Sequence, residues 1–170
     1  TFARADYIMK LNPAYRSSEL EYALNKVRCR VLISARSHKG SDYLAMLKGL
    51  APEIDRPAPV GALLESRRLP HLKHLILLDD ANRPNPVPPQ AMRFADFIRQ
   101  AGPAHRARVP TINAGLDPDD AINIQFTSGT TGAPKGATLS HFNIVNNARF
   151  TAKAMALSAA DRLCIPVPLY

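Results

Sequence analysis

The stretch FTSGTTGAPKGA, residues 126–137, is rich in glycine, serine and threonine and contains one lysine. It follows Ile122, Ile124 and Phe126, which alternate with polar residues as in a half-buried β-strand. Residues 137–139 can pair back as a second strand. Glycines free to adopt positive φ, closely spaced hydroxyl groups and one cation are what a backbone phosphate-binding loop requires. The pattern therefore predicts a β-loop-β unit with a phosphate loop.

A simple hairpin connection is the alternative interpretation, because hairpin turns also use Gly, Ser and Thr. Hairpin loops usually need only about 2–5 residues, however, and this stretch is longer. It fits neither the Walker A pattern nor the dinucleotide fingerprint G-x-G-x-x-G. Gly136 would add backbone freedom beside the loop. The candidate phosphate-binding residues are Thr127, Ser128, Gly129, Thr130, Thr131, Gly132, Ala133, Pro134 and Lys135.

Residues 1–101 show helix and strand patterns in alternation. Ser18 with Glu21 resembles a helix start, with Ser18 as the cap and Glu21 bonding back. Apolar runs at residues 30–35 and 74–78 predict buried parallel strands. Helical spacing from Tyr43 to Leu50 predicts a second helix. Loops are expected at residues 52–61 and 83–89, and further helices at 90–100 and from a cap at Ser140 to about Ala156.

The remaining segments complete an α/β chain. Residues 102–116 lack apolar periodicity and predict an ordered surface connection, and residues 117–170 form the segment with the phosphate loop. Leu163 to Val167 resembles one more strand, and residues 6–11 resemble a short one. The expected fold is a partial doubly wound, mostly parallel sheet with flanking helices and a β-loop-β phosphate loop.

The composition of the 170 residues is that of a globular protein, and no apolar run approaches the roughly 18 residues of a membrane span. The net charge of +8 raises nucleic acid as a partner, but the basic residues are scattered and only residues 105–108 form a small basic cluster. We therefore expect no nucleic acid partner. Cys29 and Cys164 have no neighbours at metal-ligand spacing, which fits a reducing compartment and no metal site.

Isolated acidic and histidine residues have structural explanations. His141 follows the loop segment, and a lone histidine is more often structural than catalytic. The pair Asp79-Asp80 stands at a strand end, where a solvated turn is expected rather than metal ligation. Asp117, Asp119 and Asp120 precede the alternating strand as turn and capping residues.

The string Thr127 to Gly136 resembles the signature phosphate loop of the adenylate-forming (AMP-binding) superfamily, and its match is highly specific. Further segments resemble the fatty acyl-CoA synthetase branch, so that the resemblance covers nearly the whole chain. These segments are residues 12–16, 19–27, 122–126 and 137–147.

The resemblance implies an ATP-dependent acid–CoA ligase that forms acyl-AMP, releases pyrophosphate and then makes acyl-CoA. It implies that Thr127 to Lys135 hold the β- and γ-phosphates of ATP. Its small-molecule partners would be a fatty acid, ATP and coenzyme A, with Mg²⁺ as the metal, and the oligomeric state stays open. In the family the catalytic residues, the magnesium ligand and the C-terminal domain lie further along the chain, so they are expected beyond Tyr170. We therefore expect an incomplete N-terminal AMP-binding domain that is inactive alone.

Two further expectations complete this interpretation. A stand-alone ATP- or phosphate-binding module without ligase chemistry is the alternative function. The expected location is the cytoplasm, or the mitochondrial matrix if a transit peptide lies upstream.

Overall fold

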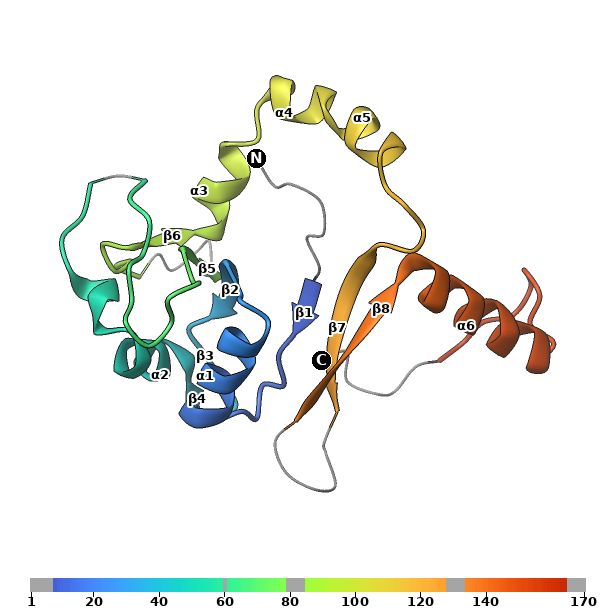
Figure 1. Cartoon of the computed structure of the whole chain (residues 1–170), viewed down its shortest axis with the longest axis horizontal. Coiled ribbons are helices and arrows are strands. Elements are labelled where there is room, and N and C mark those ends of the chain that lie inside the picture. Colours follow the sequence, from blue (N-terminus) through green and yellow to red (C-terminus); the bar gives the residue numbers. More distant parts are fainter. Residues whose placement is uncertain (1–7, 60, 79–84, 128–133, 165–170) are drawn as a thin grey trace. The chain divides into compact units, whose positions relative to one another are not determined.

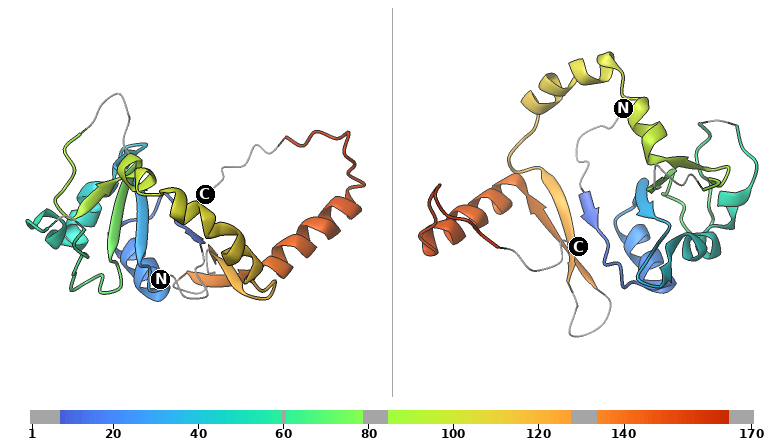
Figure 2. Two further views of the ribbon diagram at one scale, coloured as in Figure 1. Left: turned by 90° about the horizontal axis from the view of Figure 1, so that it is seen from above. Right: turned by 180° about the vertical axis from the view of Figure 1, so that it is seen from behind.

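A computed structural model describes residues 8–59, 61–78, 85–127 and 134–164 (Figure 1). The chain divides into two compact units, one of residues 13–108 and one that combines residues 1–12 with 109–170. Figure 2 shows the elements of each unit from two further directions. The two units are described separately.

The unit of residues 13–108 contains a three-stranded parallel sheet in the order β2-β5-β6. β5 (His74–Leu78) is central, and it pairs with β2 (Val31–Ala35) and β6 (Ala91–Arg93). β5 and β2 confirm the expected strands, and β5 is buried as expected, but in β2 only Leu32 is buried and Ile33 is 47% exposed. A small hairpin of β3 (Ser37–His38) and β4 (Ser41–Asp42) turns at Lys39 and Gly40, both of which have positive φ, as tight hairpin turns require.

Helices flank this sheet. α2 (Tyr43–Leu50) forms where the sequence predicts it; it contacts β2 and is followed by the short 3₁₀ helix η1 (Pro52–Asp55). α1 (Ser17–Lys26) contacts α2. The core of the unit is formed by side chains that are almost completely buried, most of them leucines. Its largest fully buried members are Leu24, Leu47, Leu50, Ile54, Leu64, Leu69, Leu72, Leu75, Ile76 and Leu77.

The start of α1 differs from the expectation. Its N-cap is Arg16 rather than Ser18, and Glu19, not Glu21, bonds back: the Arg16 backbone N–H donates to Glu19 Oε2 at 2.9 Å. The helix cap therefore lies two residues before the expected one, because Glu19, three residues after Arg16, accepts from the Arg16 N–H. The cap prediction at Ser18 is wrong.

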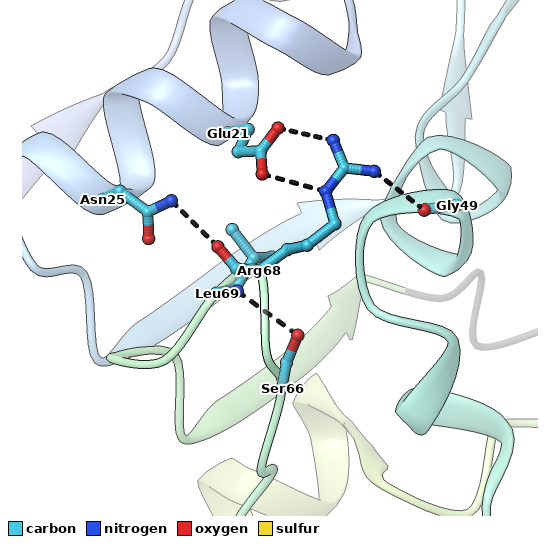
Figure 3. A network of polar contacts seen from close by, with 6 residues as sticks. All are labelled: Glu21, Asn25, Gly49, Ser66, Arg68 and Leu69. Atoms are coloured by element: carbon cyan, nitrogen blue, oxygen red, sulfur yellow. Dashed lines mark hydrogen bonds and ion pairs between the residues drawn. The ribbon is translucent and has the colours of Figure 1, made fainter.

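Glu21 instead takes part in the polar network of Figure 3. The Arg68 guanidinium donates to both carboxylate oxygens of Glu21, at 2.9 Å and 2.5 Å, and to the Gly49 carbonyl oxygen at 3.4 Å. Asn25 donates to the Arg68 carbonyl oxygen at 2.9 Å. These contacts attach residues 61–73, which lack helix and strand, to α1 and α2.

The segment after β5 also corrects the sequence analysis. A single helix was expected at residues 90–100, whereas β6 occupies Ala91–Arg93 and α3 is limited to Phe94–Arg99. The run Ala-Met-Arg contains no β-branched residue, so its strand conformation follows from pairing with β5 and not from local propensity. Asp79 and Asp80 lie outside the described residues.

Residues 102–116 are not an irregular connection. They contain α4 (Pro103–Ala107) and α5 (Val109–Ala114), in which every described side chain is exposed. Pro103 stands in the first turn of α4. Proline suits this position because its φ is helical and because an N–H group there would have no hydrogen-bond partner within the helix. The exposure of these residues agrees with the ordered surface connection that the sequence predicts, and the two short helices are what the sequence analysis did not name.

The second unit contains a sheet in the order β1-β7-β8 and one long helix. β1 (Ile8–Lys10) runs parallel to β7 (Ala121–Thr127), which pairs antiparallel with β8 (Lys135–Ser140). α6 (His141–Ala154) follows β8 directly. β1 has three residues, and its Ile8 is 71% exposed.

These elements confirm a mixed α/β fold with parallel strands and flanking helices. Leu163 and Cys164 have no regular structure, and the rest of the strand expected there lies outside the described residues. No helix in the described ranges combines the length and apolar character needed to cross a membrane.

Candidate phosphate-binding site

The candidate site lies on the β7–β8 hairpin. Both strands are longer than the sequence analysis expects: β7 continues to Thr127, and β8 begins at Lys135. The last pair of the ladder joins Thr127 to Lys135, and the preceding pair joins Phe126 to Gly136. The connection is therefore residues 128–134, which is shorter than the quoted stretch but still longer than a usual hairpin loop of about 2–5 residues.

The alternation along the hairpin separates a polar face from an apolar one. Residues directly opposite each other in an antiparallel ladder lie on the same face, and so do residues two positions apart. Thr127 and Lys135 thus share a face with the pair Gln125 and Ala137, and Thr127, Lys135 and Gln125 are exposed. The Thr127 hydroxyl donates to the Lys135 carbonyl oxygen at 3.4 Å. One hydroxyl and one cation are therefore placed side by side at the base of the loop.

The opposite face of the hairpin is apolar and packs closely. It carries Ile124, which is 7% exposed, and Phe126, which is half-buried. A Cβ atom at Gly136 would lie 3.1 Å from Ile124 Cγ2 and 3.6 Å from Phe126 Cε1. Gly136 has no positive φ, so the expected need for backbone freedom at this glycine is wrong. A glycine fits here because the side chains of Ile124 and Phe126 occupy the space that a larger residue would need.

Three of the nine candidate residues are described: Thr127, Pro134 and Lys135. Pro134 precedes β8 and is half-buried. The structure therefore brings Thr127 and Lys135 together, and phosphate binding stays a prediction for all nine candidates. Those that lie outside the described residues are Ser128, Gly129, Thr130, Thr131, Gly132 and Ala133.

Helix α6 starts with the cap that the sequence predicts. The Ser140 hydroxyl accepts from the Asn143 N–H at 3.2 Å, and Asn143 Oδ1 accepts from the Ser140 N–H at 3.0 Å. This reciprocal pair of bonds satisfies N–H groups that the helix itself leaves open. It fixes the point at which β8 ends.

His141 is half-buried and lines an open, mostly apolar groove of about 320 Å³ at the start of α6. The groove has no convergent set of ionisable groups, and none of its residues belongs to the candidate set, so it offers no acid–base chemistry to the hairpin. Its lining is formed by Leu116, Asp117, Pro118, His141, Phe142, Val145 and Asn146.

The aspartates before β7 form a turn, as expected. Asp117 Oδ1 accepts from the Asp119 N–H at 2.9 Å, and Asp120 Oδ2 accepts from the Asp117 N–H at 3.3 Å. Their carboxylates are thus used for backbone bonds. Within the described ranges, no three or more His, Cys, Asp or Glu side chains come together as metal ligands would.

Cys29 is not a nucleophile in this structure. Burial raises the pKa of its thiol to about 11, and Sγ donates to the Val31 carbonyl oxygen at 3.2 Å. Thiolate is the reactive form of cysteine, and at neutral pH this thiol stays protonated.

Comparison with known proteins assigns the chain to a family. Residues 7–170 match the family described as AMP-binding enzyme. The chain belongs to this family. Among curated relatives, the medium-chain acyl-CoA ligase ACSF2 (mitochondrial) of Danio rerio is 41% identical over 165 residues, and that of Homo sapiens is 41% identical over 169 residues. The putative acyl-CoA synthetase YngI of Bacillus subtilis (strain 168) is 36% identical over 163 residues.

This AMP-binding family chain spans only part of each relative. The matches cover 96% of the chain but 26% of either ACSF2 protein and 28% of YngI. Two solved structures share its fold: the anthranilate CoA ligase AuaEII in complex with anthranoyl-AMP, and a luciferase-like enzyme from the Zophobas morio mealworm. The first has a TM-score of 0.51 at 23% identity and covers 79% of the chain and 20% of that structure. The second has a TM-score of 0.53 at 22% identity and covers 85% and 27%.

Proposed function

We propose that this chain supplies the phosphate-binding loop of an ATP-dependent acid–CoA ligase. The observation that carries the proposal is the Thr127–Lys135 pair, which places a hydroxyl and an ammonium group at the base of a Gly-, Ser- and Thr-rich loop. Membership of the AMP-binding family and relatives named acyl-CoA ligases support it.

The donor set suits a triphosphate. Lys135 offers a positive charge, and the Thr127 hydroxyl would exchange the Lys135 carbonyl oxygen, its acceptor in this structure, for a phosphate oxygen; both side chains are exposed on one sheet face. In the proposed reaction a carboxylate attacks the α-phosphate of ATP, acyl-AMP forms, and pyrophosphate leaves with the negative charge. Donors fixed around the β- and γ-phosphates stabilise that developing charge and so lower the barrier. Residues 127–135 would make these contacts.

The proposed reaction also needs Mg²⁺ and coenzyme A, which have different roles. Mg²⁺ would neutralise phosphate charge, and from the family resemblance its ligands are proposed to lie outside these residues. Coenzyme A would accept the acyl group from acyl-AMP in the second step. The acid is proposed to be a fatty acid, in agreement with the medium-chain ligases among the relatives.

Two further parts of the interpretation are proposals. We assign residues 1–101 to the αβ units of a doubly wound domain, 102–116 to a connection and 117–170 to the phosphate-loop segment. The relatives named ACSF2 are described as mitochondrial, which favours the mitochondrial alternative over a cytoplasmic location.

The test is MgATP binding by the 170-residue chain, followed through NMR shifts of residues 127–137. Replacing Lys135 by Ala removes a charged hydrogen-bond donor and is expected to weaken binding about tenfold or more. Lys153→Ala, at an exposed position of α6, is the matched control because it removes the same charge away from the hairpin. Equal MgATP affinity of the Lys135 variant and the control would remove Lys135 from the site.

A thioester assay separates the ligase from a stand-alone phosphate-binding module. We expect the chain alone to bind MgATP without forming acyl-CoA from medium- or long-chain acids. Formation of acyl-CoA above background would contradict the expected inactivity of this segment alone.

A further inference from the structure

Gly136 lies near the end of the β7–β8 ladder, with the side chains of Ile124 and Phe126 beside it. It pairs with Phe126, one step before the Thr127–Lys135 pair that ends the ladder. A Cβ atom added at Gly136 would lie 3.1 Å from Ile124 Cγ2, and 3.6 Å and 3.7 Å from Phe126 Cε1 and Cζ. The contact with Ile124 is tighter than almost all real Cβ contacts. Any other L-residue at this position therefore has to displace a neighbour.

Ile124, the side chain that a new Cβ atom would displace, is held in place by its surroundings. Ile124 is the buried hydrophobic residue of this unit among the described residues, and it pairs with Met9 of β1 on one side and Thr138 of β8 on the other. Because β-branched side chains are stiff at χ1, Ile124 cannot easily rotate Cγ2 away. A larger residue at position 136 would therefore distort the pairing of β7 with β8 beside it.

The pair next to this contact carries the candidate ligands. Thr127 and Lys135 are held by the end of the ladder and by the 3.4 Å bond from the Thr127 hydroxyl to the Lys135 carbonyl oxygen. A displacement of β8 at Gly136 moves Lys135, its immediate neighbour, away from Thr127. The apolar face of the hairpin thus controls the spacing of groups on its polar face.

We propose that Gly136 is a positioning residue for the phosphate site. Its missing side chain lets Ile124 and Phe126 pack against the β8 backbone, and this packing holds the Lys135 ammonium group and the Thr127 hydroxyl at the spacing that binds a polyphosphate. The inference rests on the proposed function, because it assigns Lys135 and Thr127 to the same site.

The test uses Gly136→Ala in the 170-residue chain, with two readouts. Amide exchange and cross-strand NOEs between Thr127 and Lys135 report the ladder without any ligand. NMR titration with MgATP reports the site. We expect faster exchange at the end of the ladder and MgATP affinity lowered about fivefold, a partial loss of one hydrogen bond to a charged group.

Two second-site variants provide a rescue and its matched control. Ile124→Leu removes the Cγ2 branch that a new Cβ would meet and should restore both the ladder and MgATP affinity in the Gly136→Ala background. Ile124→Val keeps that branch and should restore neither. Because both replacements are apolar and close in size, a difference between them reports the specific contact and not a general change in folding.

The outcomes separate this inference from the proposed function. An unchanged ladder in Gly136→Ala, or equal rescue by both Ile124 variants, overturns the positioning role. A looser ladder with unchanged MgATP affinity also overturns it, while a weakened Lys135→Ala variant in the same titration leaves the phosphate site standing. If Gly136→Ala and Lys135→Ala both bind MgATP as tightly as the original chain, the positioning role and the proposed phosphate site are both overturned.

Discussion

Each of the two units of the chain is stabilised by a different kind of interaction. The unit of residues 13–108 contains a parallel sheet and a hydrophobic core of fully buried leucine and isoleucine side chains. In the described part of the other unit, Ile124 is the single buried hydrophobic residue, and α6 buries none of its side chains. Strand pairing and the Ser140 cap therefore contribute most of the order around the candidate site. Binding elements are commonly drawn from such less stable parts of a protein.

Core truncation is expected to produce the largest difference between the units. Leu77 on the central strand β5 is completely buried, and replacing it by Ala should lower the free energy of unfolding by about 2–5 kcal/mol. Val145 on α6 is 62% exposed, and its replacement by Ala should change that energy by less than about 0.5 kcal/mol. Urea unfolding combined with amide exchange measures both. Similar losses for the two variants would show that the apolar face of α6 is buried in solution.

Thiol reactivity gives a second, kinetic comparison. Cys29 lies in the first unit with a thiol pKa raised to about 11 by burial, whereas Cys164 is exposed. Iodoacetamide should therefore alkylate Cys164 at least about a hundredfold faster than Cys29 in the folded chain at pH 8. Peptide mass spectrometry follows the two sites separately. In urea the two rates should converge, and equal rates without urea would mean that the core around Cys29 opens freely.

The cap of α6 tests how far single polar contacts stabilise the second unit. Replacing Ser140 by Ala removes the acceptor for the Asn143 N–H and should destabilise the helix by about 1 kcal/mol. Faster amide exchange in the first turns of α6 is the measurement. Ser140→Thr keeps a hydroxyl acceptor and serves as the control, so an equal effect of both substitutions would exclude the cap as the cause.

The smallest effect is expected from the exposed Glu21–Arg68 pair. The hydrogen bond from Arg68 lowers the pKa of Glu21, so the pair stabilises the fold above the ordinary glutamate pKa of about 4.3 and ceases to do so as the pH falls through the lowered value. Glu21→Gln should therefore be less stable than the original chain at pH 7, and this difference should shrink towards pH 3.

Urea unfolding at several pH values measures this difference. Glu65→Gln, which removes a carboxylate at another exposed position, is the control. A stability difference for Glu21→Gln that is the same at pH 7 and pH 3 would contradict a role for the ionised carboxylate.

Local signals in the sequence account for much of the fold and of the candidate site. The alternation from Ile122 to Phe126 predicts β7, and Ser140 predicts the start of α6, because each depends on residues close in the chain. The Thr127–Lys135 pairing is also local, since the two residues flank one loop. Long-range contacts were harder to predict. β6 forms by pairing with β5, and Glu21, which the sequence analysis expected at a helix cap, accepts from Arg68 far along the chain.

Gly136 shows a different limit of sequence reasoning. Glycine beside a loop suggests a need for unusual φ, and only the positions of Ile124 and Phe126 show that the need is for space. The residues 128–133 lie outside the described part, so their predicted phosphate contacts stay predictions.

The strict alternation of the hairpin links the length of the loop to its chemistry. Lys135 shares a face with Thr127 because the two strands are paired in one register. If the loss or gain of one loop residue were absorbed by a one-residue slip of β8, its side chains would exchange faces, and the lysine would turn towards Phe126. A change of two residues would preserve the face. The face on which Lys135 lies therefore depends on whether the length of the loop changes by an odd or an even number of residues.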